Sequence, residues 1–276
     1  MTNDEKIVRE KLCKAELEIM DNIVNACEEL HLKYVICAGT LLGAVRHEGF
    51  IPWDDDIDIA MPREDYEVFI AKASKYMDSK LFIQNYLTEP NTNALWTKVR
   101  NTRTIFFEND NKDFDMCHGI FVDIFPLDRI KKGRLSSEIE FIKRYKFNLV
   151  AGCYCEPYYK GIRHPIKKIL AYFIRNTICL RTPIHEWLKK EDERRRAMNQ
   201  KGDNCYPIHF FENKGSLTYE ELFDDMLFNF EDRKYRGPKE YDLYLRKMYG
   251  DNYMQLPPEG KRITHRPLKI EFEDKD

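Results

Sequence analysis

Long apolar segments are missing from this chain of 276 residues. No apolar run approaches the roughly 20 residues that cross a bilayer, so we expect no membrane-spanning helix. The first residues lack the basic and then apolar pattern of a secretory leader. The eight cysteines form no C-x-x-C pair, which favours reduced thiols. Together these absences predict a cytoplasmic protein.

Internal repeats, low-complexity linkers and basic residues interleaved with aromatic ones are also absent from the sequence. A groove that follows a nucleic-acid strand needs such interleaving, so we expect no nucleic-acid partner. The hydrophobic fraction of 43% and the aromatic fraction of 13% are sufficient for a folded core. Disorder therefore does not dominate the chain.

Positive charge is concentrated in one section. Residues 131–201 hold 18 Lys and Arg against 7 Asp and Glu, whereas the whole chain has a net charge of −2. Such a section either faces an anionic partner or is a helical layer solvated on its outer side.

The periodicity of apolar residues predicts mixed helices and strands. In chain order we expect a helix at 4–31, a strand at 34–38, a helix at 41–46 capped by Thr40, a strand at 57–61, a helix from Pro62 to about 73, two short strands within 95–107, a strand at 120–125 closed by Pro126, helices within 131–201 and a helix at 241–249. We divide this order into a catalytic core at 1–130, a basic helical section at 131–201 and a C-terminal segment at 202–276 that packs back on the core.

Four carboxylates occupy five positions in the most informative stretch, at Asp54, Asp55, Asp56 and Asp58. Such a cluster is costly in a partly buried site unless a cation relieves it. Oxygen ligands favour a hard divalent ion such as Mg²⁺ or Mn²⁺. Because residues two apart on a strand face the same way, Asp56 and Asp58 should project together. Asp55 should point away, and Asp54 is an additional candidate ligand.

A third carboxylate is expected from Asp123, an acid isolated within the apolar strand at 120–125. A divalent metal held by three carboxylates would neutralise phosphate oxygens and orient an in-line displacement. The alternative is that these acids cap a helix or line a solvated loop. That alternative holds for a single aspartate but not for the group.

The dipeptide Gly39-Thr40 comes between a strand and a helix, where backbone N–H groups can approach an anion. It precedes the acidic strand by about twenty residues, which suggests a phosphate-binding turn. Four basic side chains could neutralise a diphosphate there, or be ordinary surface charges: Arg46, His47, Lys98 and Arg100.

These residues resemble the pattern of the nucleotidyltransferase superfamily. More narrowly, G-T-L-L-G-A-V-R-H-E-G-F-I-P-W-D-D-D-I-D-I at 39–59 resembles the signature of the LicD family, of which fukutin-related proteins are distant relatives. Three further segments support the resemblance: T-K-V-R-N-T-R-T-I-F at 97–106, G-I-F-V-D-I-F-P-L-D at 119–128 and Y-G-D-N-Y-M-Q-L-P-P-E-G-K-R-I-T-H at 249–265.

The resemblance implies an α+β fold with a nucleotidyltransferase-like core, in which helices flank a small mixed sheet, plus the basic helical insertion. It implies metal-dependent transfer of a substituted phosphate, such as phosphocholine, from a CDP-linked donor to a hydroxyl of a cell-surface glycan, with release of CMP. The acceptor would be a lipopolysaccharide or teichoic-acid precursor, in some cases lipid-linked. Choline, ethanolamine, glycerol and ribitol all remain open as head groups.

At the positions that match the motifs of the family, the resemblance assigns site roles to individual residues. Catalytic and metal-binding roles fall to Asp56, Asp58 and Asp123, and Gly39 and Thr40 would lie near the donor phosphates. The further candidates for substrate binding are Arg46, His47, Trp53, Lys98, Arg100, Arg262 and His265. Arg262 and His265, in the closing segment of the resemblance, either complete the site or only hold the tail in place. The residue that deprotonates the acceptor is either Asp123 or Asp54. The rivals are a nucleotidyltransferase acting on a protein or small molecule, and an inactive glycan- or nucleotide-binding protein.

The basic section contains an amphipathic segment at 166–180. Its apolar residues, among them Ile166, Leu170 and Phe173, are expected to pack on the core. The alternative is a peripheral contact with the anionic inner face of a membrane, which would suit an enzyme whose acceptor is built on a lipid.

Overall fold

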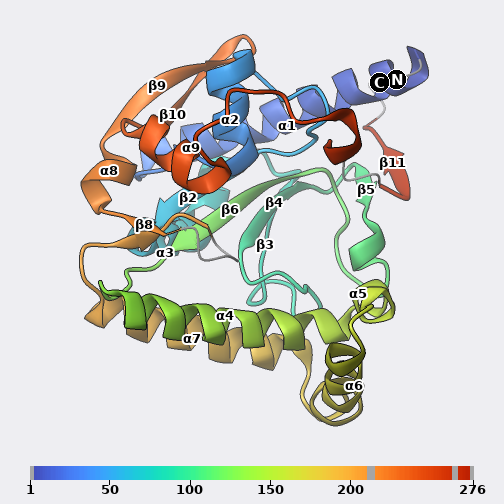
Figure 1. The fold of residues 1–276 in the computed structure, drawn as a ribbon. Coiled ribbons are helices and arrows are strands. Elements are labelled where there is room, and N and C mark those ends of the chain that lie inside the picture. The colour runs from blue at the N-terminus through green and yellow to red at the C-terminus, as the bar shows by residue number, and fades with distance from the viewer. Residues whose placement is uncertain (1–2, 210–214, 263–266, 274–276) are drawn as a thin grey trace.

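The computed structural model describes residues 3–209, 215–262 and 267–273. Its centre is a five-stranded sheet in the order β1-β2-β6-β4-β3 (Figure 1). Strands β2 and β6 run parallel, and the other neighbours run antiparallel. Helices lie on both sides of this sheet. The predicted α+β class, with a small mixed sheet flanked by helices, is therefore confirmed.

The described α-helices are α1 (Asn3–Glu29), α2 (Ala38–His47), α3 (Arg63–Lys72), α4 (Arg134–Tyr154), α5 (Glu156–Gly161), α6 (Pro165–Ile174), α7 (Ile184–Lys201), α8 (Tyr219–Phe223) and α9 (Tyr241–Tyr249). Short 3-10 turns occur at Ala73–Tyr76, Asn109–Asn111 and Glu259–Lys261, and a π-helical segment at Arg175–Cys179. The strands are β1 (Val35–Ile36), β2 (Asp58–Pro62), β3 (Leu81–Gln84), β4 (Thr97–Asn101), β5 (Ile105–Phe107), β6 (Phe121–Leu127), β7 (Tyr206–Pro207), β8 (Ser216–Leu217), β9 (Asp225–Phe230), β10 (Arg233–Pro238) and β11 (Lys269–Glu271).

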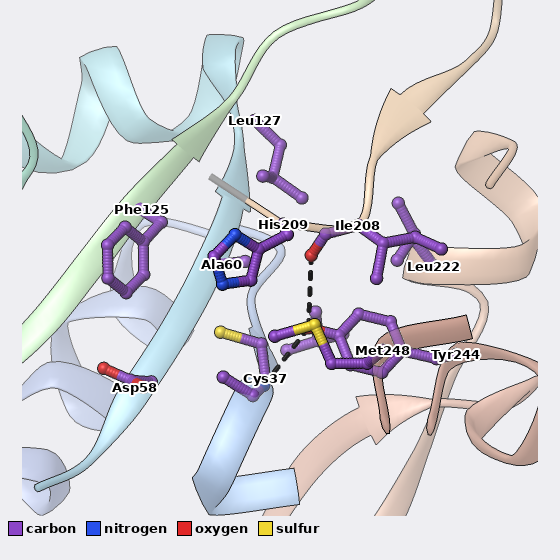
Figure 2. Close-up of a pocket in the computed structure, with 12 residues that line it drawn as sticks. Cys37, Asp58, Ala60, Phe125, Leu127, Ile208, His209, Leu222, Tyr244 and Met248 are labelled. Atoms are coloured by element: carbon purple, nitrogen blue, oxygen red, sulfur yellow. Dashed lines mark hydrogen bonds between the residues drawn. The ribbon is translucent and has the colours of Figure 1, made fainter. Parts of the chain in front are cut away.

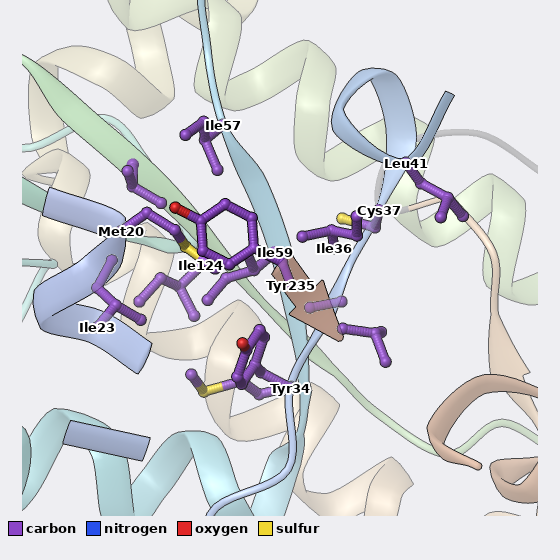
Figure 3. Packing of buried hydrophobic residues seen from close by; sticks show 14 of the residues in the cluster. Met20, Ile23, Tyr34, Ile36, Cys37, Leu41, Ile57, Ile59, Ile124 and Tyr235 are labelled. Carbon is purple, nitrogen blue, oxygen red and sulfur yellow. The ribbon is translucent and has the colours of Figure 1, made fainter. Parts of the chain in front are cut away.

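Helix α1 covers the apolar face of the sheet. Figure 3 shows Met20 and Ile23 of this helix packed against Ile57, Ile59 and Ile124. All five side chains are fully buried. Because side chains alternate along a strand, burying this face leaves the neighbouring positions of β2 and β6 on the opposite face. That opposite face carries the polar residues of the site.

Helices α4 and α7 form a second layer, side by side beneath the sheet (Figure 1). They reach the sheet through Phe147 and Leu188, which cluster with Leu95 and contact the partly buried Phe125 of β6. The basic helical section is therefore attached to the core by an apolar contact at one end of the strands.

A buried ion network also joins the second layer to the core. The guanidinium of Arg63 binds both carboxylate oxygens of Asp128, at 2.7 and 2.6 Å, and one oxygen of Asp192 on α7 at 2.9 Å. Asp192 also accepts hydrogen bonds from Tyr86 and Arg196, both at 2.7 Å. The network joins α3, the end of β6 and α7.

The β9–β10 hairpin packs against β1 and α2. At its tip, the Glu231 carboxylate accepts a hydrogen bond from the backbone N–H of Phe50 at 3.0 Å. The backbone N–H of Glu231 donates to the backbone carbonyl of Glu48 at 2.7 Å. Gly49 makes this approach possible, because a Cβ there would lie 2.2 Å from the Glu231 carboxylate. The hairpin thus holds the loop that leads into the acidic run.

The prediction that Pro126 closes the strand at 120–125 is wrong. Pro126 lies within β6. Its ring is tolerated because β4 pairs with β6 only as far as Ile124. Beyond that residue, β6 keeps one neighbour, β2, and a missing N–H on the other side costs no ladder hydrogen bond.

The expectation that the segment at 166–180 packs on the core is wrong. Ile166, Leu170 and Phe173 of α6 are all exposed, because the helix buries its other side, through Ala171 and Ile174, against α4 and α5. Among the described residues, no helix combines the length and apolarity that a bilayer crossing requires.

Candidate active site

Asp58 and Asp123 lie opposite each other on neighbouring parallel strands. The register of β2 and β6 pairs these two residues directly, and the register of β4 and β6 pairs Asp123 with Lys98. Three charged side chains from separate parts of the sequence thereby occupy one row across the sheet. Regular strand pairing alone places them together.

Lys98 and Asp123 form a buried ion pair. The Lys98 ammonium lies 2.9 Å from each carboxylate oxygen of Asp123, and it also lies 3.4 Å from the centre of the Phe121 ring. Burial raises the pKa of Asp123, although the charge of Lys98 acts in the opposite direction. One fixed cation is therefore built into the row.

More negative than positive charge surrounds Asp58. Burial is the main cause that raises its pKa well above the ordinary range, followed by repulsion from Asp56 and Asp123. Asp54 adds to the same effect, whereas Lys98 counters it more weakly. Such a cluster gains stability from a further cation, whether a metal ion or a positively charged part of a substrate.

Thr40 supports Asp58 rather than capping a helix. Its hydroxyl accepts a hydrogen bond from the Asp58 backbone N–H at 2.8 Å, and the side chain is buried. The predicted N-cap role is wrong, because α2 begins at Ala38 and Cys37 occupies the cap position without a side-chain bond. Thr40 instead fixes the first residue of β2 against α2.

Gly39 allows a carboxylate to lie against the first turn of α2. A Cβ at this position would be 2.5 Å from an oxygen of Asp54, which is closer than two such atoms approach. Positive helix-end charge favours a carboxylate here. Asp54 therefore reaches the Gly39-Thr40 turn, where a donor phosphate was expected.

We predict that Gly39→Ala lowers turnover at least about tenfold while the protein stays folded, because the new methyl group displaces the end of the flexible Asp54 side chain rather than the backbone. Alanine also favours helix over glycine by about 1 kcal/mol, so the melting temperature should not fall. Steady-state kinetics and thermal melts measure the two effects. If the loss acts through Asp54, Gly39→Ala should add little to an Asp54→Ala variant; full additivity would contradict the mechanism.

Three of the predicted substrate-binding side chains lie around the Trp53 ring. The guanidinium of Arg262 lies 4.7 Å from its ring centre and that of Arg46 lies 5.8 Å away, while the His47 ring packs edge-on at 6.3 Å. Arg46 also donates to the carbonyl of Tyr253 at 2.9 Å. Residues 46–53 and the C-terminal segment therefore meet at one cationic and aromatic surface.

Arg100, another predicted substrate-binding residue, is occupied by contacts within the protein. Arg100 is fully buried, and it donates to the Gln84 side chain and to the Gly119 carbonyl, each at 2.6 Å. Its guanidinium also stacks on Phe121, 4.7 Å from the ring centre. These contacts give Arg100 a role in holding β3, β4 and β6 together. His265 lies outside the described residues.

The ligand atoms available at the site suit a hard divalent cation, since the side chains around Asp58 are carboxylates. Burial, followed by repulsion from these carboxylates, raises the pKa of Asp58. Within the described ranges, however, no three or more His, Cys, Asp and Glu side chains are arranged as a ready metal cage. A metal here would need ligands from substrate as well, which is typical of Mg²⁺ bound with phosphates.

A small cavity lies next to Asp58, on the same face of the sheet (Figure 2). Its volume is about 100 Å³, and its walls are mainly apolar. Figure 2 shows Phe125, His209, Tyr244 and Met248 around it, with the Asp58 carboxylate at one side. The sequence predicted the helix that carries Tyr244, but an apolar pattern gives no indication of which cavity a helix will line.

Tyr244 also closes the wall of this cavity. Its hydroxyl accepts a hydrogen bond from the backbone N–H of Ala38 at 3.1 Å and bonds to the Ile208 carbonyl at 3.3 Å. The start of α2 is thereby tied to α9 and to the segment after β7. No pattern in the sequence signals this contact, which joins residues about 200 positions apart.

Comparison with known proteins shows which family and which proteins this chain is similar to. Residues 31–157 match the family described as LicD/FKTN/FKRP, nucleotidyltransferase domain. The chain is 29% identical over 268 residues to the lipopolysaccharide cholinephosphotransferase LicD of Haemophilus influenzae, a match that covers 90% of this chain and 92% of that protein. An uncharacterised protein of Rickettsia typhi is 43% identical over 58 residues, which are 21% of this chain and 19% of that protein. An uncharacterised protein of Rickettsia prowazekii is 63% identical over 35 residues, which are 13% of each chain. Residues 31–157 therefore match the LicD family, and nearly the whole chain is similar to a LicD protein.

Proposed function

We propose that this protein transfers phosphocholine, or a similar substituted phosphate, from a CDP-linked donor to a hydroxyl of a cell-surface glycan such as lipopolysaccharide. The observation that carries the proposal is the row of Asp58, Asp123 and Lys98 beside the Gly39-Thr40 turn. The similarity along nearly the whole length of a lipopolysaccharide cholinephosphotransferase supports the choice of head group and acceptor.

In the proposed reaction, the acceptor oxygen forms a bond to the phosphorus of the substituted phosphate. The bond from that phosphorus to the CMP oxygen breaks, and CMP leaves with the electron pair. The acceptor proton passes to a carboxylate, for which Asp54 and Asp123 are the candidates. Burial raises the pKa of Asp123, which makes it a better base than an exposed aspartate.

We propose Asp56, Asp58 and Asp123 as the protein ligands of Mg²⁺ or Mn²⁺. The metal would neutralise phosphate oxygens and favour an in-line displacement. Lys98, already fixed beside Asp123 at 2.9 Å, supplies a permanent positive charge next to the reacting phosphate. Arg46 and Arg262, whose guanidinium groups lie near the Trp53 ring, would bind the nucleotide part of the donor.

The cavity beside Asp58 is the proposed site of the head group. A quaternary ammonium ion is apolar on its surface and positively charged, so it fits aromatic walls next to carboxylates. Phe125, Tyr244 and Met248 supply the apolar walls and Asp58 the negative charge. A head group held there would leave its phosphate close to the charged row.

Filling the cavity should change donor preference. Ala60 lines it on β2, so we predict that Ala60→Ile raises the KM for CDP-choline by roughly tenfold, as expected when a pocket loses space for methyl groups. The KM for CDP-ethanolamine, which lacks these methyl groups, should rise much less. Both values come from the same enzyme preparation, which controls for misfolding. Equal changes for the two donors would place the head group elsewhere.

Product analysis tests the reaction itself. The protein is incubated with CDP-choline, Mg²⁺ and a lipopolysaccharide acceptor, and mass spectrometry follows both products. Free CMP together with phosphocholine on the acceptor supports the proposal. Nucleotide retained on the acceptor would instead show nucleotidyl transfer, and the absence of any product with every CDP-linked donor would favour a binding protein.

The donor itself can be identified by thermal shift, since a ligand that binds only the folded state raises its melting temperature. CDP-choline, CDP-ethanolamine, CDP-glycerol and CDP-ribitol are compared, each with and without Mg²⁺. The proposal expects the largest shift from CDP-choline and a requirement for metal.

A further inference from the structure

One helix of the basic section presents its apolar side to solvent. Helix α6 carries five large apolar side chains and Leu180, just after the π-helical segment, adds a sixth, all between 49% and 75% exposed. We call this set the α6 patch: Ile166, Ile169, Leu170, Tyr172, Phe173 and Leu180. Isolated exposed apolar residues are ordinary, but a group of this size on one short segment marks an interaction surface.

The exposure of the α6 patch follows from how the helix packs. Ala171 and Ile174 are buried in a small cluster with Leu149, Val150 and Cys153 of α4. This packing uses one side of α6, and the patch occupies the remaining circumference. In Figure 1 the helix lies at the end of the α4–α7 layer, away from the central sheet. No element among the described residues covers it.

The charged residues along the segment that carries the patch are all of one sign. From Lys160 to Arg181 the sequence has six Lys and Arg and no Asp or Glu. Of these, Arg163, Lys168 and Arg181 are exposed beside the patch. Lys167 instead points back to the protein, with its ammonium 5.5 Å from the Tyr158 ring centre.

We infer that the α6 patch binds the surface of an anionic membrane. An apolar stripe flanked by lysine and arginine is the composition of helices that lie in the interface of a bilayer. The apolar side chains would enter the boundary between head groups and acyl chains, while the exposed basic side chains contact anionic lipid head groups. The patch is separate from the candidate active site, so the inference does not depend on the proposed reaction.

A second copy of this chain is a poorer occupant. Pairing two copies through the patch would bring the two sets of basic residues together with no acidic residue between 160 and 181 to balance them. Like charges facing each other across an interface oppose association. Anionic lipid removes this repulsion, because it supplies the missing negative charge.

The test is sedimentation of the full-length protein with vesicles. One set contains phosphatidylcholine and phosphatidylglycerol in a 3:1 ratio, and the other contains phosphatidylcholine alone. We expect binding to the anionic vesicles at least about tenfold stronger than to the neutral ones, since each basic side chain near the surface contributes roughly fivefold. Raising the salt concentration should weaken the binding.

Two variants separate the apolar and electrostatic contributions. Ile169→Ser/Phe173→Ser should lose at least about tenfold in binding, and Lys168→Gln/Arg181→Gln should lose preference for anionic over neutral vesicles. The matched control is Leu87→Ser/Leu227→Ser, which removes two leucines exposed to 59% and 60%, as Phe173 and Ile169 are at 59% and 60%. The control should bind as the unmodified protein does.

Several results would overturn the inference. They are no binding of the unmodified protein to anionic vesicles, equal losses in the patch and control variants, or a dimer in analytical ultracentrifugation that disappears in the patch variant while vesicle binding does not change. Circular dichroism of each variant confirms that the helices are intact, so a loss of binding reports on the surface.

Discussion

Replacing Asp58 with asparagine should reduce turnover by roughly a thousandfold, the loss expected when a group that stabilises charge at the reacting phosphate is removed. The amide keeps the shape of the side chain but supplies no negative charge for a cation. The backbone N–H of residue 58 keeps its bond to Thr40, so the geometry of β2 should persist. Release of CMP at saturating donor measures the effect.

The same substitution should not destabilise the protein. Burial and the nearby carboxylates raise the pKa of Asp58, which means that the ionised side chain costs folding free energy at neutral pH. Asparagine removes that cost, and we expect an equal or higher melting temperature. A stable but inactive variant separates a role in the reaction from a role in folding.

Asp55 provides the matched control from the same acidic run. Asp55 lies before β2, which begins at Asp58, and it is not among the carboxylates, Asp54, Asp56 and Asp123, that raise the pKa of Asp58. Asp55→Asn should therefore keep activity within about twofold. Asp56→Asn should behave like Asp58→Asn. Near-normal activity in the Asp58 variant, or equal losses in the Asp55 and Asp58 variants, would contradict the assignment of the acidic site.

Removing the Arg63 side chain should cost about 3–5 kcal/mol of the free energy of unfolding, the range for breaking a buried ion pair from one side. Arg63→Ala leaves Asp128 and Asp192, both at most 3% exposed, without the cation that binds them at 2.6 to 2.9 Å. Urea unfolding followed by circular dichroism measures the loss. Because the network joins α3 to α7, the variant should also loosen the helical layer.

The control for this experiment is Arg246→Ala. Arg246 forms an exposed pair with Asp242 one helical turn away, and such pairs contribute little to stability. Its free energy of unfolding should equal that of the unmodified protein within error. If Arg63→Ala were equally stable, the network would be unnecessary to the fold.

The network also predicts a dependence on acid. Burial opposes the ionisation of Asp192, but the charge of Arg63 and a hydrogen bond from Arg196 outweigh it and hold the pKa of Asp192 below its ordinary value. Its stabilising contribution is therefore present above the unfolded pKa of about 3.9 and is lost as pH falls through the lower folded value. Arg63→Ala should weaken this dependence below about pH 4.

The acidic site could be predicted because its signals are local. Asp56 and Asp58 stand beside β-branched residues, and Asp123 interrupts an apolar strand, so each carries its own evidence. The direct pairing of Asp58 with Asp123 depends on the parallel register of β2 and β6. That register joins residues 65 positions apart, and neither strand specifies its partner.

Other features could not be predicted, because the pattern of apolar residues in a segment does not indicate which element the segment packs against. The periodicity of α6 indicated an apolar stripe, but not that Ala171 and Ile174 would face the protein and Phe173 would face solvent. The β9–β10 hairpin was missed for a different reason. Its turn lacks the usual Asn-Gly or Asp-Gly signal, since Glu231 itself adopts the positive φ of 55°.

The contact of Glu231 with Phe50 also bears on how much of the chain is needed for a working enzyme. Residues 31–157 match the family domain and contain every carboxylate of the proposed site. Yet the loop before those carboxylates is held by a hairpin at 225–238, and the apolar face beneath them is covered by a helix at 3–29. An excised 31–157 fragment would therefore carry the carboxylates of the proposed site without the hairpin and the helix that hold them in position.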